Sequence, residues 1–116
     1  MFTIYHNPRC RKSREALKYL KNIGKQVEVV NYLKKPLTKS NIKEILTQIE
    51  LKPIQIVRKK EADWKAVNNK NKLTEDQILD ILVKYPKTIE RPIVISEKSG
   101  VLARPLEKLI SFLNFH

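Results

Sequence analysis

The sequence predicts an α/β fold in which a parallel strand-helix-strand unit opens the chain and a β-hairpin with a final helix closes it. The first observation is that β-branched runs near both ends alternate with segments whose apolar residues recur every three or four positions. The second is size, because 116 residues with 41% hydrophobic and 31% charged side chains suit one hydrophobic core. We therefore expect a single domain over residues 1–116.

The first half of the chain predicts the parallel unit. Residues 2–5 form the first expected strand, the pair Asn7-Pro8 breaks it, and Gly24 ends the helix that follows. That helix is indicated by apolar residues at helical spacing, which are Ala16, Leu17, Leu20 and Ile23. A β-branched run at residues 27–30 supplies the second strand, and two strands joined through one helix pair in parallel.

The middle of the chain predicts two more helices around an irregular segment. Thr38 or Ser40 caps the first of them, whose apolar stripe consists of Ile42, Ile45, Leu46 and Ile49. Thr74 and Gln77 have the spacing of a capping box ahead of the second helix. Between the two helices, we expect little regular structure over residues 52–71.

The end of the chain predicts a hairpin and a helix. Two apolar runs at residues 92–95 and 101–103 flank a four-residue connection at residues 97–100. Pro105 suits the first turn of a closing helix, whose buried face consists of Leu106, Leu109, Ile110 and Leu113. The order β-α-β, then helices, then β-β-α fits a thioredoxin-like fold with a central helical insertion at about residues 38–88.

Composition excludes several classes of protein. No apolar run reaches the ~18 residues that cross a bilayer, and the N-terminus lacks the features of a signal peptide, so we expect a cytoplasmic protein. A single cysteine, Cys10, excludes an intramolecular disulfide, and with two histidines it leaves a structural zinc site short of ligands, so we expect no metal. Two glycines are too few for the glycine-rich loops that bind nucleotides.

The charge balance favours anionic partners. The 24 basic residues outnumber the 12 acidic ones and give a net charge of +12. The lysines are scattered and no aromatic stacking platform lies among them, which makes nucleic acid the least favoured partner. Arginine, whose planar fork binds oxyanions, is scarcer and three of its six positions flank Cys10; the six are Arg9, Arg11, Arg14, Arg58, Arg91 and Arg104.

Cys10 lies in the turn between the first expected strand and helix, where open α/β sheets usually bind ligands. Unpaired backbone N–H groups and the positive end of the helix dipole would face its sulfur there. Such settings lower the pKa of a free thiol from ~8.5 to between ~3.5 and ~7.5. The alternative is a small buried hydrophobe, but the neighbouring residues are polar and cationic, which favours a reactive cysteine.

The neighbours of Cys10 leave several roles open. Ser13 caps the helix, hydrogen-bonds the thiolate, or does both. His6 either donates to the sulfur or is an ordinary polar residue at the end of a strand. Arg9 and Arg14 either face the sulfur or lie on the surface of the helix.

Four motifs along the chain carry a resemblance to a known family. They are Ile4-Tyr5-His6-Asn7-Pro8-Arg9-Cys10 with Ser13-Arg14, then Val57-Arg58-Lys59, then Glu90-Arg91-Pro92-Ile93-Val94, and finally Ala103-Arg104-Pro105. In this order they resemble the glutaredoxin-coupled arsenate reductases of the ArsC family and their shorter, arsenate-reductase-like relatives. The resemblance spans nearly the whole chain.

The resemblance implies the residues of a site. Cys10 matches the nucleophile of the family. The arginines that surround the oxyanion match Arg58, Arg91 and Arg104. We expect this site to be supported by His6, Ser13, Arg14 and Pro92. The family has a cis peptide bond before the proline that matches Pro92.

The resemblance also implies a reaction. The Cys10 thiolate attacks arsenate with loss of water, glutathione or another low-molecular-weight thiol captures the arsenylated sulfur, and reduction by glutaredoxin releases arsenite. The resemblance implies no bound cofactor. We expect arsenate or a similar oxyanion and glutaredoxin as partners, and a monomer.

A second reading is a regulator without catalytic activity. A related branch of the family, the Spx-type regulators, senses redox state and binds RNA polymerase, typically with a two-cysteine C-x-x-C switch. Ser13 stands at the second cysteine position of that switch. The bulky pair Arg11-Lys12 stands where arsenate reductases of this type tend to carry small residues.

Overall fold

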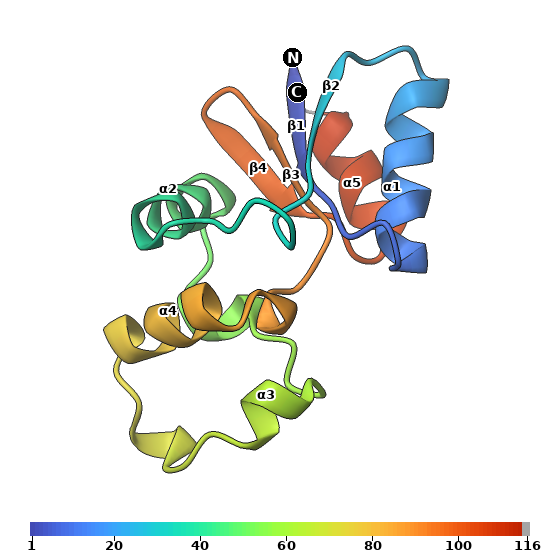
Figure 1. The fold of residues 1–116 in the computed structure, drawn as a ribbon. Helices are drawn as coiled ribbons and strands as arrows, with labels where there is room; N and C mark the ends of the chain where they lie inside the picture. Colours follow the sequence, from blue (N-terminus) through green and yellow to red (C-terminus); the bar gives the residue numbers. More distant parts are fainter. Residues whose placement is uncertain (115–116) are drawn as a thin grey trace.

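The computed structural model describes residues 1–114, and the last two positions of the expected domain lie outside the described residues. Its centre is a four-stranded sheet with the strand order β2-β1-β3-β4 (Figure 1). β1 pairs in parallel with β2 and antiparallel with β3, and β3 pairs antiparallel with β4. The strands are β1 Phe2–Tyr5, β2 Val27–Val30, β3 Ile93–Ser96 and β4 Ser99–Leu102.

Helices cover both faces of the sheet. α1 and α5 pack together on one face, whereas α2 packs against β3 and β4 on the other, with α4 beyond it (Figure 1). The helices are α1 Arg11–Asn22, α2 Lys39–Ile49, α3 Ala62–Lys65, α4 Glu75–Lys84 and α5 Leu106–Leu113. Short 3-10 turns lie at Pro53–Ile56, Lys70–Lys72 and Pro86–Thr88. The predicted thioredoxin-like α/β fold is confirmed.

The alternation of side chains along the strands creates two hydrophobic clusters. Side chains of a strand point to opposite faces in turn, so Val94 faces α1 and α5 while its neighbours Ile93 and Ile95 face the inserted helices. We call the first cluster the helix-pair core; it contains Phe2, Ile4, Ala16, Leu20, Val94, Ala103 and Leu109. We call the second the insertion core; it is larger and includes Trp64, which is 5% exposed.

Helix caps form where the sequence predicts them. The Thr38 hydroxyl accepts a hydrogen bond from the Asn41 N–H at 3.1 Å, so Thr38 rather than Ser40 caps α2. The Thr74 hydroxyl accepts one from the Gln77 N–H at 3.2 Å, which completes the predicted capping box of α4. Gly24 adopts a φ of +80° just beyond α1, a conformation that glycine tolerates best.

The hairpin differs from the prediction. Its connection contains two residues rather than four, because Ser96 pairs with Ser99 and Gly100 lies inside β4, opposite Ile95. A Cβ at Gly100 would clash with the Ile95 side chain and lie 2.8 Å from the Val94 carbonyl oxygen. Gly100 therefore serves close packing rather than a turn.

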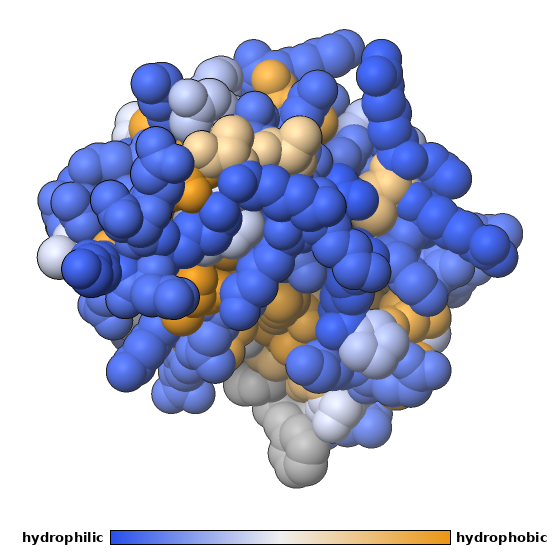
Figure 2. All heavy atoms as spheres, turned by 90° about the horizontal axis from the view of Figure 1, so that it is seen from below, coloured by the Kyte–Doolittle hydropathy of each residue, from blue (hydrophilic) through white to orange (hydrophobic). Residues whose placement is uncertain are grey.

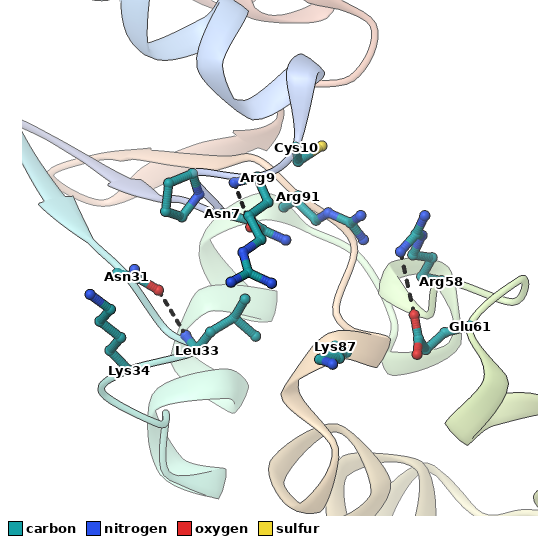
Figure 3. A pocket seen from close by; sticks show the side chains of 11 residues that line it. Asn7, Arg9, Cys10, Asn31, Leu33, Lys34, Arg58, Glu61, Lys87 and Arg91 are labelled. Atoms are coloured by element: carbon teal, nitrogen blue, oxygen red, sulfur yellow. Dashed lines mark hydrogen bonds and ion pairs between the residues drawn. The ribbon is translucent and has the colours of Figure 1, made fainter.

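The entry to α5 also differs. Pro105 is the N-cap residue, one position before the first turn in which we expected it. The peptide bond before Pro92 is cis, as the resemblance implies, and the bond before Pro105 is cis as well. Arg91, the residue before Pro92, lies just ahead of β3, at the end of the strand that is nearest Cys10 (Figure 3).

The helices and one face of the surface can be described together. Within residues 1–114, none of the helices has the length and apolarity needed to cross a bilayer. Seen from below, the molecule is mostly hydrophilic, and apolar atoms show mainly in recesses between polar side chains (Figure 2). Among the same residues, no group of three or more His, Cys, Asp or Glu side chains is placed to hold a metal ion.

Candidate active site

The loop that carries Cys10 is fixed by short-range hydrogen bonds. Cys10 is the N-cap residue of α1, and its carbonyl oxygen accepts from the Arg14 N–H at 3.0 Å. Its own N–H donates to the Asn7 carbonyl oxygen at 3.0 Å. The Asn7 side-chain oxygen accepts from the Arg9 N–H at 3.0 Å, which closes an Asx-turn. These bonds place the sulfur at the N-terminus of a helix.

Ser13 and His6 brace this loop from behind. The Ser13 hydroxyl is fully buried, lies 2.6 Å from His6 Nδ1, and accepts from the Asn7 N–H at 3.1 Å. The hydroxyl thus contacts His6 and Asn7, whereas the backbone N–H of Ser13 is the group that hydrogen-bonds Cys10. His6 pairs with Ser13 rather than with the sulfur of Cys10. Burial lowers the pKa of His6, and the charges of Arg14 and Lys21 lower it further, which favours the neutral ring.

The surroundings of Cys10 favour the thiolate. Burial alone would raise the pKa of the thiol, but a hydrogen bond from the Ser13 backbone N–H, the hydrogen bond and charge of Arg91, and the Lys12 backbone N–H together lower it below its ordinary value. Backbone N–H groups in the first turn of a helix have no partner within the helix, so they are free to stabilise the sulfur. These contacts explain why the pKa of Cys10 is lowered, as its place at the helix N-terminus predicts.

Arg91 and Arg104 lie against Cys10. Arg91 is only 6% exposed, and Arg104 Nη1 lies 3.8 Å from the sulfur of Cys10. The same Nη1 also donates to the Arg91 carbonyl oxygen at 3.4 Å. Arg91 just precedes β3 and Arg104 follows β4, so the hairpin brings both residues to one end of the sheet.

Arg58 reaches the site through an isolated β-bridge between Val57 and Ile89. On one side of the bridge the Arg58 N–H donates to the Thr88 carbonyl oxygen at 2.7 Å. This pairing places Arg58 beside the segment that leads into Arg91. Its guanidinium forms an ion pair with Glu61 at 3.4 Å between Nη1 and Oε2.

The three sequence-predicted residues Cys10, Arg58 and Arg91 line one cavity of about 610 Å³, into which their side chains point (Figure 3). Arg104 contacts the sulfur but does not line this cavity. Arg9 does line it, as does Glu61, the only acidic residue that does so. The cavity therefore combines a thiolate with several cations.

Arg14 and Pro92 are placed differently. Arg14 is exposed, and its Nη1 donates to the Pro8 carbonyl oxygen at 2.9 Å. It lines a second cavity of about 350 Å³ together with His6, so it supports the loop rather than facing the sulfur. Pro92 is fully buried, and its carbonyl oxygen accepts from the Ala103 N–H at 2.9 Å, which joins the two ends of the hairpin.

Sequence reasoning missed Tyr32 and Glu61. Tyr32 is 1% exposed, and within residues 1–114 its hydroxyl and Arg91 Nε are buried without a hydrogen-bond partner. Burial raises the pKa of Tyr32 to about 12, against the opposing charge of Arg91, so the phenol is neutral. The spacing of Arg58 and Glu61, three residues apart, was a signal for an ion pair. Nothing in the sequence distinguished Tyr32 from other core aromatics.

The arrangement suits attack on a tetrahedral oxyanion. Guanidinium groups neutralise an anion that a thiolate would otherwise repel, and they stabilise charge as an oxygen leaves. The helix N-terminus adds backbone donors on the same side. The arrangement therefore brings a thiolate and several guanidinium groups to one cavity.

Comparison with known proteins agrees with this geometry. The sequence model of the ArsC family matches residues 5–112. An arsenate reductase of Neisseria meningitidis is 37% identical over 112 residues, which cover 95% of this chain and 96% of that protein. An Escherichia coli K12 protein named uncharacterized protein YfgD is 36% identical and covers 95% and 94% of the two chains.

Solved structures agree as well. The structure of an arsenate reductase from Vibrio cholerae superposes with a TM-score of 0.89 at 34% identity, over 95% of this chain and 95% of that one. A match over nearly the whole length, at this identity and with the same fold, leaves one assignment: this chain belongs to the ArsC family.

Proposed function

We propose that this protein is an arsenate reductase in which Cys10 is the nucleophile. The observation that carries the proposal is the distance of 3.8 Å between Arg104 Nη1 and the Cys10 sulfur. Cys10 itself lines a cavity together with Arg58 and Arg91. Guanidinium groups around a thiolate favour the binding of an anion beside the sulfur, where the thiolate can attack it. We take arsenate as the substrate because relatives of this chain are named arsenate reductases.

In the proposed reaction, the Cys10 thiolate forms a bond to arsenic and one arsenate oxygen leaves as water. Glutathione then displaces a second oxygen, also as water, so that arsenic bridges two sulfurs. A glutaredoxin thiolate attacks the sulfur of glutathione, a disulfide forms between these two thiols, and the electron pair of the broken bond reduces arsenic(V) to arsenic(III). Hydrolysis of the remaining bond releases arsenite and restores the Cys10 thiolate.

The residues divide this work between them. Arg58, Arg91 and Arg104 hold the oxyanion and offset the charge that develops on the leaving oxygen. His6 and Ser13 keep the loop in the geometry that aims the sulfur at the cavity. An external thiol is required, because Cys10 is the only cysteine of the chain. The reaction needs reduced thiols, so we expect it to take place in the cytoplasm.

The experiment that tests this function is arsenate-dependent oxidation of NADPH with glutathione, glutathione reductase and glutaredoxin. Wild type is expected to be active and Cys10→Ser inactive. Arg11→Ala is the matched control, because its side chain is 85% exposed and outside the cavity. Activity that survives in Cys10→Ser, or an inactive wild type whose Cys10 is still alkylated rapidly at neutral pH, would contradict the proposal.

The regulator reading receives no comparable support. At the position of a second switch cysteine, Ser13 is fully buried and hydrogen-bonded to His6. A thiol switch at that position would have to break this brace. We therefore do not propose binding to RNA polymerase, and we expect the protein to act as a monomer with glutaredoxin as its protein partner.

A further inference from the structure

The Cys10 cavity is much larger than a tetrahedral oxyanion. A water molecule takes up about 30 Å³ of liquid volume, so an anion of five heavy atoms needs roughly 150 Å³. The cavity measures about 610 Å³, within the range of sites that hold small organic ligands. Most of its volume is therefore free for a second ligand while an oxyanion occupies the position beside Cys10.

The remainder of the cavity is cationic. Lys34 lies in the turn after β2 and Lys87 in the 3-10 turn after α4, and both lie across the cavity from Cys10 (Figure 3). Arg9 extends from the nucleophile loop toward the space between them (Figure 3). The one acidic lining residue, Glu61, is paired with Arg58 and so does not neutralise these three cations.

The chemistry at Cys10 specifies what such a ligand must bring. An adduct on the only cysteine of a chain cannot be resolved by a second cysteine of the same chain, so another molecule has to supply the thiol. To reach the adduct, that molecule has to enter the cavity in which Cys10 lies. A thiol that carries carboxylates would meet Arg9, Lys34 and Lys87 on its way in.

We infer that Arg9, Lys34 and Lys87 form a subsite for the carboxylates of an anionic low-molecular-weight thiol, which they hold with its sulfur toward Cys10. This inference rests on the proposed function, because it names the part of the site that receives the resolving thiol. Arg9, Lys34 and Lys87 are exposed, solvated charges along the cavity, where each contributes modestly and the effect depends on salt. Selectivity among thiols therefore follows their charge.

The test uses disulfides, so that it needs no arsenic. The Cys10 thiolate attacks one sulfur of a disulfide, the S–S bond breaks, and one thiolate leaves. We would measure by mass spectrometry the rates at which Cys10 reacts with anionic oxidised glutathione and with neutral hydroxyethyl disulfide. The ratio of the two rates reports the subsite, because intrinsic reactivity of the thiolate affects both rates.

The double variant Lys34→Ala/Lys87→Ala is expected to lower this ratio about tenfold at low salt, since an exposed charge pair contributes a factor of up to about five. Added salt should lower the wild-type ratio toward that of the variant. Lys98→Ala is the matched control, because Lys98 is exposed in the hairpin connection and outside the cavity. A ratio in the double variant within twofold of wild type would overturn the inference.

Charge reversal sharpens the test. Lys34→Glu/Lys87→Glu is expected to react faster with the cationic disulfide cystamine than with oxidised glutathione, the reverse of wild type. An unchanged preference would overturn the inference. If the preference reverses in the variant but wild type fails to reduce arsenate, the subsite stands and the proposed function falls. If wild type reduces arsenate but all variants keep the same ratio, the function stands and the subsite falls.

Discussion

The two sides of the Cys10 cavity are built in different ways. On the thiolate side, the side-chain hydrogen bonds that fix the loop are local; the longest of them, from His6 to Ser13, spans seven positions. On the arginine side, the contact between Arg104 and Cys10 spans 94 positions, and Arg58 arrives through a bridge to the segment before β3. Cys10, the proposed nucleophile, is thus positioned by its own loop, whereas the arginines of the proposed oxyanion site come together only in the folded chain.

This difference predicts different sensitivities. Local hydrogen bonds cost little chain entropy to form, so the thiolate side should tolerate changes in distant cores. The arginine side depends on the packing that holds three segments together, and above all on the insertion core beneath Arg58 and Arg91. Four substitutions at Trp64, Arg91, Ser13 and Glu61 test whether the two sides respond differently.

Trp64→Ala should have the largest effect, because it leaves a cavity in the insertion core. Loss of a buried tryptophan lowers the free energy of unfolding by about 3–5 kcal/mol, and Trp64 lies in the same core as Val57, the neighbour of Arg58. Urea unfolding measures the loss. Leu20→Ala is the control in the helix-pair core, with a loss of about 2–5 kcal/mol.

Both variants should unfold in one transition, because β1 and β3 contribute to both clusters. In the folded fraction of Trp64→Ala, oxyanion binding should fall more than the alkylation rate of Cys10. An equal loss of both would mean that the two sides are not built independently.

Arg91→Met should follow, because it removes a donor to the sulfur and a charge from the oxyanion site. Loss of one such donor lowers turnover by about 10²–10³. The pKa of Cys10 should rise, since Arg91 helps to lower it. The pH profile of iodoacetamide alkylation measures this shift, and Arg91→Lys separates charge from the planar fork.

The sign of the pH effect on stability follows from the same shift. Because the folded-state pKa of Cys10 is lowered, its thiolate stabilises the fold above the ordinary thiol pKa, and this stabilisation is lost as pH falls through the folded value. Arg91→Met should shrink the stability difference between alkaline and acidic pH. An alkylation midpoint identical to that of wild type would show that Arg91 does not act on the sulfur.

Ser13→Ala should destabilise the thiolate side by about 1–3 kcal/mol, because it leaves buried polar groups without a partner. The orphaned groups are the Asn7 N–H and His6 Nδ1. Thermal or urea unfolding measures the loss. Arg11→Ala in the same helix is the control, and at 85% exposure it should change stability by no more than about 0.5 kcal/mol. Equal stability of the two variants would show that the hydrogen bonds of the Ser13 hydroxyl do not stabilise the loop.

Glu61→Gln should have the smallest effect, and it should be favourable. Partly exposed ion pairs contribute about 0–1 kcal/mol, so freeing Arg58 from Glu61 should raise oxyanion affinity by up to about fivefold. Protection of Cys10 from alkylation by arsenate measures the affinity. Glu15→Gln is the control, since its ion pair with Arg11 lies outside the cavity. A lower affinity in Glu61→Gln would show that Glu61 positions Arg58 instead of competing for it.

The sequence predicts best where the determining contacts are local. Thr38 and Thr74 cap helices through bonds to residues three positions away, and the start of α1 after Cys10 follows from breakers and helical periodicity. The hairpin shows the limit. Gly100 resembles a turn residue in sequence, but it lies in β4 because the side chain of Ile95 and the approach of α2 leave no room for a Cβ.

Within the candidate site, the same limit applies to Ser13 and Tyr32. The hydroxyl of Ser13 has local capping partners in principle, but the fold buries it against His6, and that contact decides its role. Tyr32 carries no sequence signal, because its significance lies in the burial of its hydroxyl near Arg91. Burial is a property of packing, which no short pattern encodes.

By itself, the sequence determined the order of strands and helices, the reactive setting of Cys10 and the scarcity of arginine, since periodicity, capping and charge act over a few residues. Only the tertiary structure decided that Arg91 and Arg104 meet at the sulfur of Cys10, that Arg58 lines the same cavity in an ion pair with Glu61, and that this cavity extends to two lysines. These contacts depend on which segments the sheet and the insertion core bring together. Burial of apolar surface along the whole chain determines which segments those are.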